Sequence, residues 1–236
     1  MIDPSALRTR LAEVRARIER AAGRAGRDPA SIRLVAISKT FPADAVRAAA
    51  DAGQIDFGEN KVQEALEKIE RTSDLPLRWH LVGHLQSNKA KKTGRFHVIH
   101  SIDAPALMAK VDEAARAAGR TIDLLVQVDL AGETTKHGAR EEQLLEIFAA
   151  SRALLSSRVV GLMLLPPAVD NPDEARPYFR ELKSVRDRLV ARGVDGSTLK
   201  ELSMGMSHDF EVAVEEGSTM VRVGTAIFGG RSYARP

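Results

Sequence analysis

Eight short apolar segments, separated by segments with helical periodicity, constrain the fold of this chain more than any other feature. The apolar segments lie at 33–38, 54–58, 79–83, 97–100, 122–129, 159–164, 199–204 and 219–224. The helical segments lie at 42–52, 60–73, 86–93, 104–118, 139–156, 172–192 and 208–217. Eight alternating strand–helix units within 236 residues are typical of a single α/β (β/α)8 TIM barrel. An open doubly wound sheet is the alternative, although no G-x-G-x-x-G motif follows the first expected strand.

An additional amphipathic helix is expected before the first strand, over residues 5 to 25. Its apolar stripe consists of Leu7, Leu11, Val14 and Ile18. Asp3 and Ser5 are candidate N-cap residues for this helix. No interior linker is long enough to separate two domains. We therefore expect one domain over residues 1–236, in which residues 1–27 form an N-terminal helix that packs on the barrel.

Composition excludes several classes of protein. The chain has no cysteine, so it has no disulfide, no thiolate metal site and no cysteine nucleophile. A net charge of only +3 and an aromatic content of 4% argue against a nucleic-acid-binding module. No apolar run is long enough to span a bilayer, and the Arg-rich N-terminus contains acidic residues that transit peptides lack. We expect a cytoplasmic protein that binds neither nucleic acid nor membrane.

Polar residues cluster where the expected strands end. They are Lys39, Glu59, Asn60, His84, Ser101, Asp103, Lys136, His137, Ser203 and Ser207. The active sites of (β/α)8 barrels lie at the carboxyl ends of the strands, so these loops would line one common mouth. The histidines of the chain are scattered through separate loops without metal-ligand spacing, which predicts structural or rim roles and no metal site.

Lys39 follows the apolar run LVAIS directly. At the rim of a barrel a lysine loses solvent and lies near other cations, and both effects lower the pKa of its amine. Such an amine is nucleophilic and can form a Schiff base with an aldehyde. The other interpretation is a strand-end lysine that extends its ammonium into water. Position alone leaves both interpretations open.

The C-terminal region contains two turns rich in glycine and small polar residues, SMGMS and VGTAIFG. Free backbone N–H groups at helix starts, with hydroxyls beside them, can bind an anion, and barrels often hold phosphate in the loops after strands 7 and 8. Ser207, as the expected N-cap of the next helix, would form a phosphate cradle with Gly224 and Thr225. Two ordinary turns remain the alternative, because glycine and serine are common in turns.

Arg222 lies between Val221 and Val223 in a strand that should be buried on both faces. A buried charge is costly unless it is paired, so Arg222 either contacts a ligand or forms an ion pair with a carboxylate such as Glu59 or Glu201. An aldehyde-reactive lysine, a phosphate cradle and a central arginine together indicate a site for pyridoxal 5′-phosphate (PLP).

Longer motifs give the sequence a family resemblance that covers nearly the whole chain. The chain resembles the pyridoxal phosphate homeostasis proteins, a PLP-binding family with the barrel fold of the alanine racemase N-terminal domain. The motifs are VAISKT (35–40), FGENKVQEA (57–65), WHLVGHLQSNKAK (79–91), HSID (100–103), VQVDLAGETTKHG (126–138), GLMLLPP (161–167) and LSMGMSHDFEVAVEEGSTMVRVGTAIFG (202–229).

The resemblance implies a role for each matching position. Lys39 would form the internal Schiff base with PLP, and Arg222 would face the pyridine nitrogen. Asn60 would line the ring or its 3-hydroxyl side. Ser207, Gly224 and Thr225 would hold the phosphate, and Met204 and Met206 would pack near the cofactor.

The resemblance leaves two further points open. Lys136 lies where the family has a lysine implicated in handing the cofactor on, and it is equally consistent with a solvated loop lysine. The basic runs Lys89–Lys92 and Arg231–Arg235 are candidates for a second, weaker PLP site.

Two classes of function fit a PLP site on this fold. Racemases of this fold use the lysine and a tyrosine from a second domain as their two bases. Neither Tyr178 nor Tyr233 matches such a motif, and no counterpart of the second domain is expected. We therefore expect a monomeric carrier or regulator of PLP and vitamin B6 without catalytic turnover, with PLP-dependent apoenzymes as its recipients. A PLP-dependent amino-acid racemase is the alternative.

Overall fold

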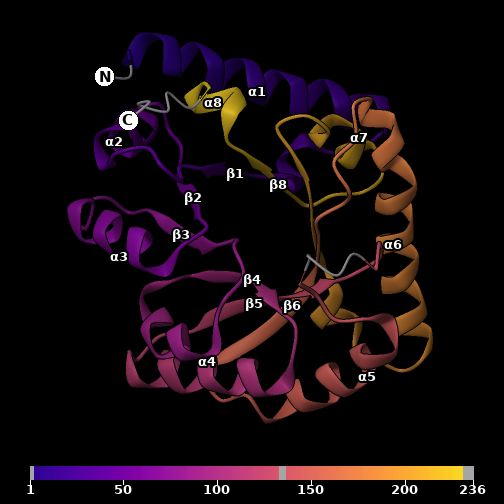
Figure 1. Ribbon diagram of the computed structural model, residues 1–236. Coiled ribbons are helices and arrows are strands. Elements are labelled where there is room, and N and C mark those ends of the chain that lie inside the picture. The colour runs from indigo at the N-terminus through magenta and orange to yellow at the C-terminus, as the bar shows by residue number, and fades with distance from the viewer. Residues whose placement is uncertain (1–2, 133–136, 231–236) are drawn as a thin grey trace.

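The computed structural model describes residues 3–132 and 137–230, and its centre is a closed barrel of eight parallel strands (Figure 1). The strands are β1 (Arg33–Ile37), β2 (Asp56–Glu59), β3 (Arg78–Leu81), β4 (Val98–Ile102), β5 (Ile122–Val128), β6 (Ser157–Leu164), β7 (Glu201–Met206) and β8 (Met220–Val223). Each strand pairs with the next in the chain, and β1 pairs with β8 to close the sheet. The predicted (β/α)8 barrel is confirmed, and each expected strand corresponds to one observed strand.

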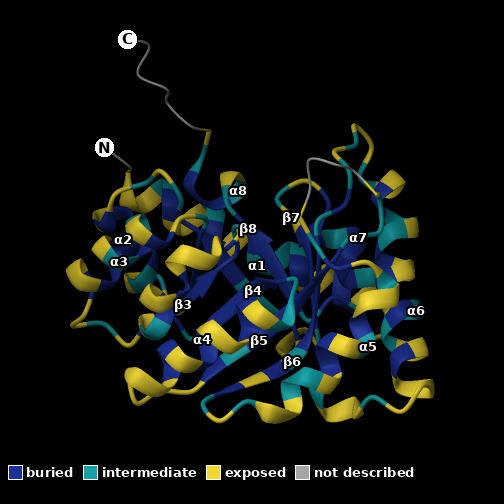
Figure 2. Ribbon diagram, turned by 60° about the horizontal axis from the view of Figure 1, so that its bottom comes forward, coloured by how far each residue is buried: buried dark blue, intermediate teal, exposed yellow. Residues whose placement is uncertain are grey.

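Helices surround the barrel (Figures 1 and 2). The α-helices are α1 (Pro4–Arg24), α2 (Ala43–Asp51), α3 (Val62–Arg71), α4 (Pro105–Ala117), α5 (Glu141–Ala150), α6 (Arg176–Ala191), α7 (Phe210–Glu215) and α8 (Thr225–Phe228). The 3-10 segments are η1 (Pro29–Ser31), η2 (Ser87–Arg95), η3 (Ser151–Ala153), η4 (Pro172–Ala175) and η5 (Gly196–Leu199). The helix expected at 86–93 is therefore a 3-10 segment, and the one expected at 172–192 divides at Arg176. None of the helices in the described part of the chain is long and apolar enough to cross a membrane.

Helix α1 packs across the closure of the barrel, against α2, α7 and α8 (Figure 1). The side chain of Asp3 accepts a hydrogen bond from the Ser5 N–H at 2.9 Å, so Asp3 is the N-cap, as predicted. The predicted apolar stripe is buried. Arg10 Nε donates to the carbonyl oxygen of Ile227 at 2.7 Å, which connects α1 directly to α8. The extra N-terminal helix thus joins the first and last units of the barrel.

Strand residues alternate between two environments. Outward-facing side chains such as Phe57, Trp79 and Leu81 belong to a large core cluster, which fills the layer between strands and helices. Smaller clusters lie on the other face of the strands, in the barrel interior. They contain Val98, Leu125, Met163 and Met220, and Val35, Ile37 and Val82. The buried strands occupy the centre of Figure 2, and the outer faces of the helices are exposed. This alternation decides which side chains can reach a site inside the barrel.

Candidate functional site

A cavity of about 560 Å³ opens where the strands end. It is lined by Ile37, Lys39, Asn60, Val82, Gly83, His84, Gln127, His137, Leu165, Met206, Ser207, His208, Arg222, Gly224 and Thr225. These residues come from the carboxyl ends of strands or from the loops that follow them, where barrels place their sites. The cavity brings together all but one of the predicted cofactor-binding residues. The exception is Met204.

Register explains why Met204 is absent from the cavity lining. Its side chain is fully buried in the large outer cluster, together with that of Leu202. Ser203 lies between them, so its side chain points into the barrel. The strand then changes register before Met206, at Gly205 with a φ of 94°, and Met206 lines the cavity. The family resemblance implied that both methionines pack near the cofactor, and the local sequence does not reveal this break in the alternation.

Lys39 lies just beyond the end of β1 in a tight turn. The Phe41 N–H donates to the carbonyl oxygen of Ser38 at 3.0 Å. Thr40 has a φ of 70°, an uncommon conformation for a residue with a Cβ. Its N–H donates to Glu64 Oε1 at 2.6 Å, and this contact ties the turn to α3. The backbone on both sides of Lys39 is thereby fixed while its side chain reaches the cavity.

A buried ion pair between Lys68 and Glu59 stabilises this turn. Lys68 Nζ lies 2.6 Å from Glu59 Oε1 and 2.8 Å from Glu64 Oε1, and it donates to the carbonyl oxygen of Ser38 at 2.8 Å. Ser38 Oγ also donates to Glu59 Oε1 at 2.6 Å. Burial raises the pKa of Glu59, and the Lys68 ammonium opposes this effect. Sequence reasoning missed Lys68, because it lies inside an ordinary amphipathic helix and its partners come from other elements.

The two C-terminal loops meet at Ser207. Ser207 Oγ accepts hydrogen bonds from the backbone N–H of Gly224 at 3.0 Å and, more weakly, of Ala226 at 3.5 Å. The expectation that Ser207 is the N-cap of the next helix is wrong. The N-cap of α7 is Asp209, and Asp209 Oδ1 accepts from the Met206 N–H at 2.6 Å in a tight turn. This turn directs the Ser207 hydroxyl toward the start of α8, beside Thr225.

Arg222 is 4% exposed and still lines the cavity. Its Nη1 donates to Ser203 Oγ at 2.6 Å, and its Nη2 donates to the carbonyl oxygen of Leu164 at 2.8 Å. The alternative of an ion pair with Glu59 or Glu201 is wrong, since neither carboxylate contacts Arg222 in the described structure. Burial lowers the pKa of Arg222 to about 10, although the nearby Asp209 carboxylate acts in the opposite direction. Arg222 remains a cation at neutral pH.

Asn60 follows β2 and faces the cavity next to the loop that contains Gly83. A Cβ atom at Gly83 would overlap the backbone carbonyl oxygen of Asn60. The two loops therefore touch through backbone atoms, and only glycine allows this approach. The position of Asn60 at the cavity depends on that contact.

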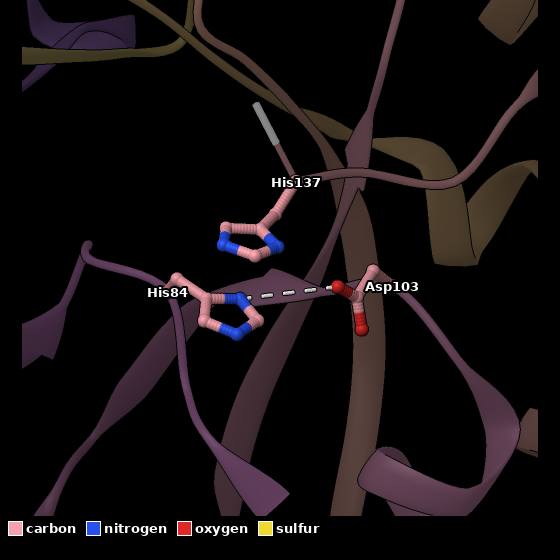
Figure 3. Close-up of side chains that lie close together, drawn as sticks. All are labelled: His84, Asp103 and His137. Carbon is pink, nitrogen blue, oxygen red and sulfur yellow. Dashed lines mark ion pairs between the residues drawn. The ribbon is translucent and has the colours of Figure 1, made fainter. Parts of the chain in front are cut away.

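Three side chains from separate loops meet at the rim of the cavity (Figure 3). The rings of His84 and His137 stack with centroids 3.4 Å apart and an interplanar angle of 10°, and His84 Nδ1 lies 4.0 Å from Asp103 Oδ2. One ligand atom from each lies within 4.8 Å of the others, a spacing that could hold a metal ion. The nearly parallel rings direct their nitrogen lone pairs side by side rather than toward one point, so the rings would have to turn to coordinate a metal. Sequence spacing could not reveal this cluster.

Lys136 and the basic run Arg231–Arg235 lie outside the described residues. The other basic run, Lys89–Lys92, is largely exposed in η2. Its Lys89 and Lys92 line a second cavity, of about 400 Å³, which shares Asn60 and His84 with the first.

The closed parallel barrel and the cavity at its carboxyl end define a class, the (β/α)8-barrel proteins that bind a small molecule through their βα loops. The family model "Alanine racemase, N-terminal domain" matches residues 3–232. The chain belongs to this family, and within it to the pyridoxal phosphate homeostasis proteins.

A pyridoxal phosphate homeostasis protein of Aquifex aeolicus is 44% identical over 225 residues, which cover 95% of this chain and 98% of the relative. The structure of PipY from Synechococcus elongatus with PLP bound is 38% identical with a TM-score of 0.81, and the match covers 94% of this chain and all of that chain. Alanine racemase of Corynebacterium glutamicum is only 18% identical with a TM-score of 0.71, and this chain covers 64% of it. That last likeness concerns the fold alone.

Proposed function

We propose that this chain binds PLP covalently through Lys39 and serves intracellular PLP homeostasis as a carrier or regulator without catalytic turnover. The observation that carries the proposal is that Lys39, Arg222 and the Ser207–Gly224–Thr225 group line one cavity. The similar protein from Synechococcus elongatus was solved with PLP bound, and the relatives are named as homeostasis proteins.

The groups in the cavity fit PLP one by one. An amine suits its aldehyde, with which it forms a C=N bond and releases water. A backbone N–H and two hydroxyls, on Gly224, Ser207 and Thr225, suit its phosphate. A guanidinium, on Arg222, suits its pyridine nitrogen as a hydrogen-bond donor. A cavity of about 560 Å³ lies within the usual size of cofactor sites.

The same residues favour binding over catalysis. Bound PLP supplies an electron sink for amino-acid chemistry, and this sink is strongest when the pyridine nitrogen is protonated. Arg222 remains a cation and can only donate, so it keeps that nitrogen unprotonated. Lys39 is only half-buried, so water or an incoming amine can reach the C=N bond between Lys39 and PLP. These features favour reversible exchange of the cofactor.

The proposal also includes the extent of the domain, the compartment, the oligomeric state and the partners. Residues 1–236 form one PLP-binding domain, with residues 1–27 as the N-terminal helix on the barrel. The protein acts in the cytoplasm as a monomer and passes PLP to PLP-dependent apoenzymes. Neither nucleic acid nor membrane is a partner.

The first experiment is reduction of the PLP-loaded protein with borohydride, followed by peptide mapping. A yellow absorbance band that borohydride bleaches, with a pyridoxyl group on Lys39, is expected. Lys39→Ala should abolish the band. The matched control Lys200→Ala, at an exposed lysine that precedes β7 at the other end of the barrel, should retain it. A colourless wild-type protein after incubation with PLP would refute the proposal.

Racemase activity is the second candidate, because two imidazoles, His84 and His137, line the same cavity as Lys39 and offer acid–base groups. Solvent-deuterium exchange at the Cα of either enantiomer of alanine, assayed on the same sample, decides between the two. Turnover that His84→Asn or His137→Asn abolishes would favour the racemase. Exchange no faster than with free PLP supports the carrier.

A further inference from the structure

A line of hydrogen-bonded side chains runs through the barrel interior from Arg222 to Asp56. Arg222 Nη1 lies 2.6 Å from Ser203 Oγ, which lies 2.9 Å from His100 Nδ1. His100 Nε2 lies 2.9 Å from His80 Nδ1, and His80 Nε2 lies 2.8 Å from Asp56 Oδ1. The residues come from β8, β7, β4, β3 and β2. We call this set the interior chain.

The hydrogen bonds at the two ends of the interior chain each have a fixed direction. A guanidinium has no acceptor, so Arg222 donates to Ser203 Oγ. The carboxylate of Asp56 has no donor, so His80 donates to it from Nε2. If His80 is neutral, its Nδ1 accepts from His100 Nε2–H, and His100 Nδ1 accepts the hydroxyl proton of Ser203. In this arrangement both histidines carry their single proton on Nε2.

The surroundings keep both rings neutral. The side chains of His80, His100 and Ser203 are fully buried. Burial lowers the pKa of His80, and the nearby cations Arg33 and Arg78 add to this effect while Asp56 opposes it. Burial also places the pKa of His100 well below its ordinary value, and the groups around it that could carry positive charge, namely His80, Arg222 and Arg33, add to the effect. The direction of the chain is therefore retained at neutral pH.

The interior chain replaces packing that the barrel supplies elsewhere with apolar side chains. At neighbouring interior positions the strands carry Val98, Leu125, Met163 and Met220. Buried polar groups lower stability unless every partner is satisfied, and here each ring nitrogen has a partner. One end of the chain is the arginine that lines the cavity. This connection indicates a role at the site and not only in the core.

We propose that Ser203, His100 and His80 are positioning residues that hold the Arg222 guanidinium against the pyridine nitrogen of the cofactor. The inference rests on the proposed function, which assigns that nitrogen to Arg222. Ser203 and the Leu164 carbonyl fix two of the N–H donors of Arg222, so the guanidinium cannot turn freely within the cavity. The histidines fix the hydroxyl proton of Ser203, so that its oxygen always presents a lone pair to Arg222.

The first test needs no cofactor. In ¹⁵N-histidine-labelled protein, long-range ¹H–¹⁵N spectra at pH 7 should show His80 and His100 as neutral rings with the proton on Nε2. Ser203→Ala removes the donor to His100 Nδ1 and should shift that nitrogen toward its unbonded value. The matched control is Ser157→Ala, since Ser157 is another buried serine and its Oγ has no hydrogen-bond partner among the described residues. An Nδ1–H tautomer or a charged ring would overturn the inference.

The second test measures the cofactor. Ser203→Ala should raise the dissociation constant of PLP about tenfold, as expected for the loss of one hydrogen bond to a charged group, and it should move the midpoint of the pH-dependent absorbance of bound PLP. His80→Asn, at a residue three hydrogen bonds away from Arg222, should produce a smaller change of the same kind. Ser157→Ala should change neither quantity. Equal dissociation constants and equal midpoints in all of these proteins would overturn the inference.

Borohydride labelling separates this inference from the proposed function. Ser203→Ala and His80→Asn should still be labelled on Lys39, because they do not touch that side of the cavity. Normal labelling with unchanged binding would refute the interior chain alone. Absence of labelling in the wild-type protein would refute the proposed function, and this inference with it. If Ser203→Ala does not fold, as judged by its thermal melting, His80→Asn answers the same question without altering a residue next to Arg222.

Discussion

The hydroxyl of Ser207 accepts a hydrogen bond from the backbone N–H of Gly224, 3.0 Å away, across the loops that follow β7 and β8. The two residues are 17 positions apart in the sequence. This contact brings a hydroxyl and the start of α8 to the same wall of the cavity, beside Thr225. A phosphate placed here would replace Ser207 Oγ as the acceptor of the Gly224 N–H, and it would also accept a hydrogen bond from the Ser207 hydroxyl.

Ser207→Ala should therefore weaken PLP binding selectively. A hydrogen bond to a charged group contributes about 1.5–3 kcal/mol, so we expect the dissociation constant to rise by at least about tenfold. Pyridoxal, which lacks the phosphate, should bind the variant and the wild type equally. Absorbance titrations with both compounds measure this difference. An equal loss of affinity for PLP and pyridoxal would assign Ser207 to another part of the ligand.

Lys68→Met should destabilise the fold by about 3–5 kcal/mol, because it leaves the buried Glu59 carboxylate without its cation. The double variant Lys68→Met/Glu59→Gln should recover part of this loss, and Lys183→Met, at an exposed lysine of α6, serves as the control. Urea unfolding at pH 7 measures all of these free energies.

The same variant should also show an altered dependence on pH. The pKa of Glu59 is raised in the folded protein, so the folded state takes up a proton more readily than the unfolded state does. The deficit of Lys68→Met should consequently shrink as the pH falls from 7 toward 5. A deficit that is constant over this range would mean that Glu59 stays ionised without Lys68.

His97 should make the protein less stable in mild acid. Burial lowers its pKa to about 4, and the cations of Arg120 and Arg78 add to the effect. Because the folded-state pKa lies below the unfolded value, the stabilisation is complete above about pH 6.5 and declines as the pH falls toward about 4. Between about pH 4 and pH 6.5 the imidazole of His97 binds a proton in the unfolded chain but stays neutral in the folded protein.

The test compares His97→Asn with the wild type in urea unfolding at several pH values. Asparagine Oδ1 can replace His97 Nδ1 as the acceptor of the Trp79 N–H. The slope of the unfolding free energy against pH should fall by about one proton, with the contributions of His80 and His100 remaining. Parallel slopes for the two proteins would show that His97 titrates normally in the folded state.

Gly83→Ala should reduce both stability and PLP affinity, because its Cβ would force the backbone of Asn60 away. Overlap of this kind typically lowers stability by about 1–3 kcal/mol. Gly196→Ala is the matched control, since no atom lies within 4 Å of the Cβ it would introduce. Thermal melting and PLP titration measure the two effects. Unchanged PLP affinity in Gly83→Ala would separate Asn60 from the cofactor site.

Much of the barrel could be predicted because its signal is local. Each strand is a short apolar run bounded by polar residues, and each run shifted by at most a few residues in the structure. The helix expected at 86–93 became 3-10 because this type depends on detailed hydrogen bonding and not on apolar spacing. The break at Arg176 follows η4 and precedes Pro177, whose ring is tolerated in the first turn of α6.

The site was predictable wherever strand ends determine it. Lys39, Asn60, Arg222 and the loops after β7 and β8 converge because parallel strands end at one mouth. The remaining features depend on which face of a strand a side chain takes or on distant partners. Met204 lies in the outer core cluster and not at the cavity, and of the two alternatives for Arg222 the carboxylate pair is absent, with Ser203 as its side-chain partner. Ser203 and His100 are 103 residues apart, and no local pattern joins them.

Helix α1 has a consequence for how the chain reaches its native state. The Arg10 contact with Ile227 spans 217 residues, and α1 also packs on α2 and α7. The surface on which α1 packs is therefore complete only after α2 near the start of the barrel and α7 and α8 near its end have formed. Contacts between such distant segments form slowly, since a long loop must be closed before they contribute any stability. Until then the apolar stripe of α1 stays exposed and can associate with other unfolded chains. Closure of the barrel buries the stripe and so prevents this aggregation.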